Sequence, residues 1–179
     1  MVMRWLFGDQ LGPHFLDDTD ADVLLIESTA VLRRRRFHRQ KAHLVLSAMR
    51  HRAAELGERC TYLRTDTYGS GLAEIAGSLE VIQPTSWAAL HLVDRQADER
   101  DVERLPARGF GASRAEFTAW ADGRGRKRLL MEDFYRDNRR RIGLLMDGAE
   151  PVGGRWNFDA ENREPPPKGH RTLGLPEPV

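Results

Sequence analysis

The chain has 179 residues, of which 40% are hydrophobic and 31% are charged, enough for one domain with a buried core and too few for two full domains. Its 28 basic and 27 acidic residues leave a formal net charge of +1, which gives no overall attraction to nucleic acid or membrane. The single cysteine, Cys60, excludes an internal disulfide framework and a multi-cysteine metal site held by this chain alone. The lack of a secretory signal and of about 20 consecutive apolar residues predicts a cytoplasmic protein without a membrane partner.

Five short apolar runs predict the strands of a parallel sheet. The first covers residues 3–7 and ends at Gly8-Asp9, and the others cover residues 23–26, 61–63, 79–82 and 102–105. Continuous apolar runs of this length are typical of strands that are buried on both faces.

Helical patterns alternate with these strands. The clearest covers residues 39–56, where apolar residues recur at helical spacing and Gly57 supplies a stop: Ala42, Val45, Leu46, Met49, Ala53 and Leu56. Residues 71–76 and 86–96 are expected to form crossover helices. The alternation predicts an α/β fold with an open, doubly wound parallel sheet of about five strands.

After residue 105 the pattern changes to helices alone. Ser113 and Glu116 form a capping-box pattern that opens a helix through Trp120, and residues 131–145 show the apolar side of a second helix. We expect one domain over residues 1–163. Residues 164–179 contain five prolines and are predicted to form a linker or a disordered tail.

Polar residues follow the first two predicted strands and suggest a ligand site. Gly8-Asp9-Gln10-Leu11 follows the first strand, and Glu27 and Ser28 end the second. In an open α/β sheet, ligands bind in the crevice outside the carboxyl ends of the strands. The alternative is that Asp9 caps a turn and Glu27 is exposed. There is no glycine-rich phosphate loop and no nucleophile with a base, which argues against a small-ligand enzyme of this fold class.

A basic stretch covers residues 33–52, with eight arginines and lysines and no acidic residue. It begins with Arg33, Arg34, Arg35 and Arg36. Such a stretch suits weak contact with a DNA backbone, and its alternative interpretation is a solvated surface. His38, His43 and His51 lack metal-ligand spacing, so no metal site is expected.

Several motifs together resemble the bacterial photolyase-related proteins, the group of iron-sulfur bacterial cryptochromes and (6-4) photolyases. They are Gly8-Asp9-Gln10-Leu11, His38 with Lys41, Ser47-Ala48-Met49-Arg50-His51, Glu116-Phe117 with Trp120, Met131-Glu132 with Phe134-Tyr135-Arg136, and the stretch PVGGRWNFDAENR at residues 151–163. The last motif is the most specific. We expect its Trp156, Asp159 and Asn162 to fix a domain boundary and not to act in catalysis.

The resemblance implies a Rossmann-like N-terminal domain that holds an antenna chromophore, 6,7-dimethyl-8-ribityllumazine. It implies that FAD and an iron-sulfur cluster belong to a larger helical domain, so neither cofactor is expected in this chain. The chain would then be the antenna part alone. Without a separate flavin-binding domain it would not repair DNA. The expected chromophore site consists of Gly8, Asp9, Gln10, Leu11, Glu27, Ser28, Val31, Arg34 and Val45.

Two positions depart from the family pattern. Where many members carry a glutamate and then an aromatic residue in the lumazine site, this chain has Val31 and Arg34. A buried ligand donor left without the carboxylate costs roughly 1–3 kcal/mol. We therefore expect weaker lumazine binding, with the arginine run favouring a more anionic ligand or none. The alternative function is a non-catalytic nucleic-acid or protein-binding module that uses residues 33–52.

Overall fold

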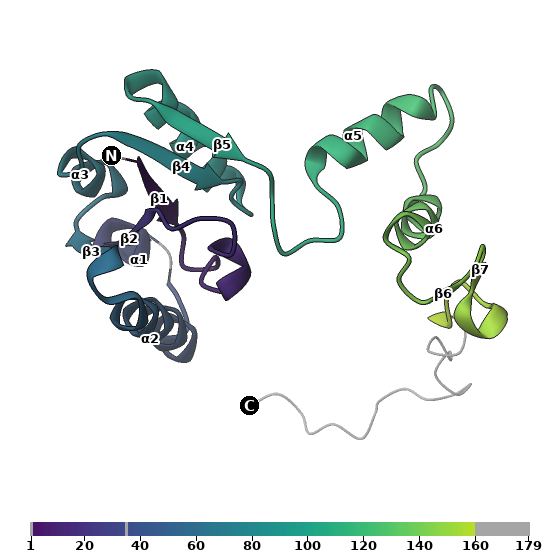
Figure 1. Ribbon diagram of the computed structural model, residues 1–179, viewed down its shortest axis with the longest axis horizontal. Coiled ribbons are helices and arrows are strands. Elements are labelled where there is room, and N and C mark those ends of the chain that lie inside the picture. The colour runs from purple at the N-terminus through teal and green to yellow at the C-terminus, as the bar shows by residue number, and fades with distance from the viewer. Residues whose placement is uncertain (1, 35, 160–179) are drawn as a thin grey trace, which may run out of the picture. The chain divides into compact units, whose positions relative to one another are not determined.

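A computed structural model describes residues 2–34 and 36–159 (Figure 1). The chain divides into two compact units, Met1–Glu116 and Phe117–Val179. The predicted tail at residues 164–179 lies outside the described residues, as does Asn162. Among the described residues, no helix is both long and apolar enough to cross a bilayer.

The first unit contains a five-stranded parallel sheet in the order β3-β2-β1-β4-β5. Its strands are β1 (Val2–Leu6), β2 (Asp22–Ser28), β3 (Cys60–Thr65), β4 (Ser78–Ile82) and β5 (Val102–Leu105). The chain runs from β1 to one edge through β2 and β3, and then crosses to β4 on the other side of β1. The predicted doubly wound α/β sheet is confirmed.

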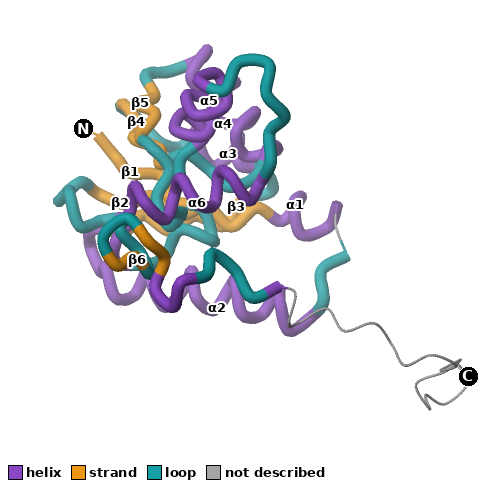
Figure 2. The backbone as a smooth tube through the Cα atoms, turned by 90° about the vertical axis from the view of Figure 1, so that its right-hand side faces the viewer, coloured by secondary structure: helices purple, strands orange, loops and turns teal. Residues whose placement is uncertain are grey.

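Helices cover both faces of this sheet, as Figure 2 shows for α2 on one side and for α3 and α4 on the other. The helices are α1 (Thr29–Arg34), α2 (Arg39–Leu56), α3 (Tyr68–Ala73) and α4 (Trp87–Glu99), with 3-10 turns at Pro13–Phe15 and Gly57–Arg59. Successive side chains of β1 point to opposite faces of the sheet. Trp5 packs with Leu72 and Val93 on one face, and Leu6 packs with Met49 on the other. Each face therefore has its own apolar core.

The ends of α2 follow from local chemistry. His38 precedes the helix, and its Nδ1 accepts a hydrogen bond from the Gln40 amide at 3.3 Å. Gly57 ends it with a φ of 57°, a left-handed value that favours glycine. The predicted bounds of α2 are thus confirmed, whereas α3 begins at Tyr68, three residues before the expected helix, because Thr67 and Ser70 form a capping box.

The second unit consists of short elements. They are α5 (Arg114–Gly123, which begins in the first unit), α6 (Met131–Ile142), the antiparallel pair β6 (Met146–Asp147) and β7 (Glu150–Pro151), and a 3-10 turn at Val152–Gly154. The predicted capping box of α5 is present, because the Ser113 amide donates to Glu116 at 2.6 Å and the Glu116 amide to Ser113 at 3.2 Å. Phe117, Trp120 and Phe134 join the two helices, with ring centroids 4.9–5.9 Å apart.

Candidate functional site

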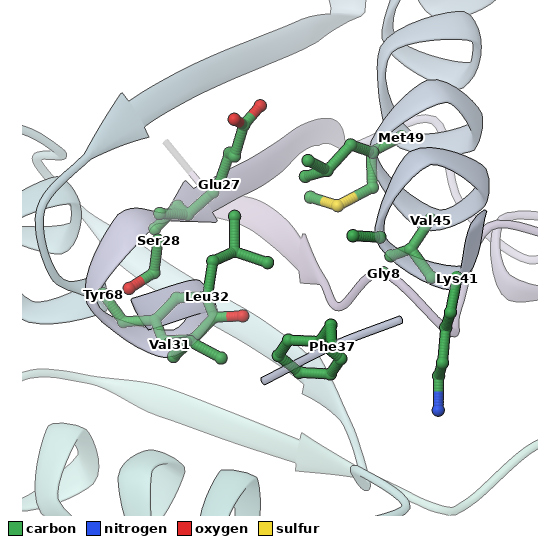
Figure 3. A pocket seen from close by; sticks show the side chains of 13 residues that line it. Gly8, Glu27, Ser28, Val31, Leu32, Phe37, Lys41, Val45, Met49 and Tyr68 are labelled. Atoms are coloured by element: carbon green, nitrogen blue, oxygen red, sulfur yellow. The ribbon is translucent and has the colours of Figure 1, made fainter. Parts of the chain in front are cut away.

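A pocket opens at the carboxyl ends of β1 and β2, between the sheet, α1 and α2. We call it the α2 pocket; it holds about 560 Å³, including the part open to solvent. Its lining residues are Gly8, Ile26, Glu27, Ser28, Val31, Leu32, Phe37, Lys41, Ala42, Val45, Leu46, Met49 and Tyr68. Figure 3 shows Phe37 and Leu32 facing Val45 across the pocket, with the Lys41 ammonium at its outer side. The pocket therefore has mostly apolar walls and a few polar groups, which is typical of small-molecule sites.

Gly8 lets α2 approach the end of β1 closely. A Cβ atom on Gly8 would lie 3.0 Å from Val45 Cγ1 and 3.1 Å from Met49 Sδ, closer than side chains normally pack. Glycine at this position therefore sets the spacing between the β1 turn and α2, and with it one wall of the pocket.

Glu27 is a buried carboxylate whose oxygens are already bonded. Its Oε2 accepts hydrogen bonds from the Tyr62 hydroxyl at 2.7 Å and from Arg50 Nη2 at 2.9 Å, and Arg64 Nε lies 3.5 Å from its Oε1. The pairing of β2 with β3 aligns Glu27 with Arg64. In Figure 3 the carboxylate points away from Phe37 and Lys41. Glu27 thus builds the pocket wall and offers few free lone pairs to a ligand.

The charges and hydrogen bonds around Glu27 shift the pKa values of Glu27 and Tyr62. Burial on its own raises the pKa of Glu27, but the hydrogen bonds from Tyr62 and Arg50 and the charges of Arg50 and Arg64 outweigh it, and the pKa lies below its ordinary value. Burial, followed by the hydrogen bond to Glu27, raises the pKa of Tyr62 to about 12. Glu27 is therefore ionised and Tyr62 neutral at neutral pH.

The remaining polar groups of the pocket are Ser28, Tyr68 and Lys41. The Ser28 hydroxyl donates to the Asp66 carbonyl at 3.1 Å, which leaves its oxygen able to accept. Burial, and then the charge of Asp9, raises the pKa of Tyr68, so its hydroxyl stays protonated. Lys41 is exposed. These groups can bind the polar atoms of a ligand whose flat body contacts the apolar walls.

Five of the nine expected site residues line the α2 pocket, namely Gly8, Glu27, Ser28, Val31 and Val45. The other four, Asp9, Gln10, Leu11 and Arg34, are not among its lining residues. Asp9 accepts a hydrogen bond from Thr85 at 2.5 Å, Leu11 packs against the core on the α2 face, and Arg34 is exposed. The alternative in which Glu27 is exposed is wrong, because its side chain is 4% exposed.

Gln10 bridges two loops across the sheet. Its Oε1 accepts from the Phe7 amide at 3.2 Å, and its Nε2 donates to the carbonyls of Ile82 at 3.1 Å and Gln83 at 3.4 Å. The side chain is buried, and it ties the turn after β1 to the end of β4, where the strand order reverses. Gln10 therefore holds the two loops together at this point of the sheet.

Phe37, Leu32 and Tyr68 line the pocket, although no sequence pattern predicts them as site residues. Leu32 belongs to α1, which was not predicted, and Phe37 lies between α1 and α2, within the basic stretch. Tyr68 packs with Trp5 and Phe7 at centroid distances of 5.9 Å and so reads as a core residue. The apolar face of α2 could have predicted this wall of the pocket from the sequence, since Val45, Leu46 and Met49 all line it.

Other candidate groups have structural roles. Burial raises the pKa of Cys60 to about 11, so the thiol is protonated at neutral pH and is a poor nucleophile. Three or more potential metal ligands do not cluster anywhere in the described segments. In the second unit, Arg139 is buried and donates to the Trp156 carbonyl at 3.1 Å and to the Tyr135 hydroxyl at 3.1 Å. Trp156 is thus attached to α6, and Arg140 lies over its ring at 4.5 Å.

Comparison with known proteins assigns the family. The family model described as deoxyribodipyrimidine photo-lyase-related protein matches residues 4–179. The chain belongs to this family. A (6-4) photolyase of Agrobacterium fabrum (strain C58 / ATCC 33970) is 40% identical to this photolyase-related chain over 181 residues, which cover 89% of the chain and 35% of that relative. The chain thus spans about a third of the length of the curated relative, and the resemblance seen in the sequence motifs is confirmed.

Proposed function

We propose that the first unit of this photolyase-related chain is a chromophore-binding domain and that the α2 pocket holds a flat heteroaromatic molecule, with 6,7-dimethyl-8-ribityllumazine as the candidate. The observation that carries the proposal is the position and lining of the pocket: an apolar slot beside the ends of β1 and β2, with neutral hydroxyls and one lysine at its edges. Bound there, such a molecule would supply absorption of visible or near-ultraviolet light.

The residues fit the ring better than they fit a neutral polyol tail. Leu32, Phe37 and Val45 offer apolar contacts to the ring faces, and the Tyr68 hydroxyl can donate to a ring carbonyl or nitrogen. Val31 gives no acceptor, and Glu27 is engaged by Tyr62 and Arg50. The chain therefore binds and orients the ring chiefly by shape, and water is excluded by the same apolar side chains.

Binding is tested by titrating 6,7-dimethyl-8-ribityllumazine with the full chain and following ligand fluorescence and thermal unfolding. Saturable binding should raise stability by about 2.7 kcal/mol when free ligand is 100 times the dissociation constant. Ala42→Phe places a ring in the pocket and should abolish the effect. Ala54→Phe, at an exposed position of the same helix, is the matched control and should bind as the wild type does. No effect at saturating ligand would overturn the proposal.

For the whole photolyase-type protein, we propose that light energy collected here serves a flavin held by a separate domain, which carries out DNA repair. The relative is a (6-4) photolyase and is about three times as long as the matched segment, which supports this role. Mixing this chain with a flavin domain of the family, and measuring flavin photoreduction under light absorbed only by the antenna, tests it. Equal photoreduction with and without this chain would count against it.

The alternative is nucleic-acid binding by residues 33–52. Three of its basic residues are engaged by carboxylates: Arg33 by Asp66, Arg50 by Glu27 and Arg52 by Glu55. The charge left for a phosphate backbone is therefore smaller than the sequence indicates. Binding of DNA that weakens steeply with salt and is lost when the arginines at 33–36 are neutralised would support this alternative.

A further inference from the structure

One cation, Lys41, lines the α2 pocket, and two more, Arg36 and Arg39, are its near neighbours in the sequence. Lys41 is the lining residue at the outer side of the pocket (Figure 3). Arg36 directly precedes the lining residue Phe37, and Arg39 lies two positions before Lys41. All three side chains are exposed, and none of them forms an ion pair within residues 2–34 and 36–159.

Two of the three acidic groups near the pocket are paired with arginines. Glu27 faces two guanidinium groups, those of Arg50 and Arg64. Asp66 accepts from Arg33 at 3.3 Å and from the Thr29 hydroxyl at 3.0 Å. Asp9 accepts a hydrogen bond from the neutral Thr85 hydroxyl and keeps its negative charge, which acts on Tyr68. An anion at the pocket entrance would therefore meet the positive charge of Lys41, with repulsion chiefly from Asp9.

The first turn of α2 adds to this positive charge. It contains no acidic residue, so the partial positive charge at the start of the 18-residue helix is not cancelled by a side chain. The charge acts at the same end of the helix as Lys41. The side-chain and backbone contributions thus have the same sign at the pocket entrance.

We propose that the ligand of the α2 pocket is an anionic heterocycle, with its flat ring in the apolar interior and a phosphate-type group at the entrance beside Lys41 and Arg36. The inference rests on the proposed function and names the chemical class of its ligand. It accounts for two features together. The interior offers a neutral polyol tail few acceptors besides the hydroxyl oxygens of Ser28 and Tyr68, since Val31 is apolar and Glu27 is engaged. The exposed Lys41, Arg36 and Arg39 form no ion pair among the described residues.

The test compares 6,7-dimethyl-8-ribityllumazine with its 5′-phosphate ester, two compounds that differ only in the charged group. Dissociation constants for the full chain are measured by ligand fluorescence at low and at moderate salt. We expect the ester to bind about tenfold more tightly at low salt, because a charge-assisted hydrogen bond adds to the ring contacts. Added salt should reduce this advantage and leave the affinity of the parent compound nearly unchanged.

Variants assign the effect to the entrance. Lys41→Ala and the double variant with Arg36→Ala should bring the affinity of the ester down to that of the parent compound, measured for the same variant. Arg95→Ala removes the same charge from an exposed position of α4 and is the matched control. Equal affinities for the two compounds in the wild type, or an advantage that survives the double variant, would overturn the inference while the proposed function stands. If neither compound binds, the proposed function fails and the inference fails with it.

Discussion

Replacing Glu27 by glutamine tests whether the buried ion cluster supports the pocket wall. The amide keeps the shape of the side chain but presents an NH₂ group to the donors of Arg50 and removes the negative charge that faces Arg50 and Arg64. Hydrogen bonds to charged groups contribute about 1.5–3 kcal/mol. Because the side chains of Arg50 and Arg64 are 49% and 66% exposed, the lower part of that range applies, and we expect a loss of about 2 kcal/mol in the free energy of unfolding.

The pH dependence gives the sharper test. The folded state lowers the pKa of Glu27, so its contribution is fully present above the ordinary carboxyl range, about pH 4.3, and is lost as the pH falls through the folded-state value. The difference between wild type and Glu27→Gln should therefore be full at pH 7 and shrink below about pH 4. Urea unfolding followed by circular dichroism measures it at each pH.

A matched control is available on the surface. Glu55→Gln removes an exposed ion pair with Arg52 and should change stability by less than about 0.5 kcal/mol at any pH. A Glu27→Gln loss as small as that of the control, or one of the same size at pH 3 as at pH 7, would refute the argument.

Three further results are expected. Tyr62 should titrate near pH 12 in ultraviolet difference spectra, with stability falling between about pH 10 and 12 as the folded state resists losing its proton; a Tyr62→Phe chain whose late absorbance change is as large as that of the wild type would contradict the assignment. Gln10→Leu should cost about 2 kcal/mol in urea unfolding, because the Phe7 amide and the Ile82 carbonyl lose a buried partner, and an unchanged midpoint would show that the bridge is dispensable. Val31→Glu should strengthen binding of neutral ribityl-lumazine, and an unchanged dissociation constant would mean that residue 31 does not contact the tail.

The sheet and α2 could be predicted because their signals are local. Apolar runs placed all five strands within two residues, and the helical spacing from Ala42 to Leu56, with Gly57 after it, gave the bounds of α2. The helix α1 was missed because Thr29–Arg34 is short and runs into an arginine series that reads as a loop. The two residues between β6 and β7 are Gly148-Ala149, with glycine at the first turn position; this hairpin signal was not recognised in the sequence.

The candidate site could be predicted only in part, since polar side chains find their partners across the fold. Gln10 reads as a ligand group beside a strand end, yet its amide bonds to the carbonyl of Ile82, 72 residues away in sequence. Glu27 was correctly placed at the strand rim, but its engagement with Tyr62 and Arg50 depends on the β2–β3 register and on the position of α2. These contacts decide which acceptors remain for a ligand.

The most direct test of the proposed chromophore site is a crystal structure of the full chain grown with 6,7-dimethyl-8-ribityllumazine at saturating concentration. We predict density for the ring in the α2 pocket, between Phe37 and Val45 and within hydrogen-bond distance of the Tyr68 hydroxyl. Ligand density at another surface, or an α2 pocket that stays free of ligand at that concentration, would contradict it.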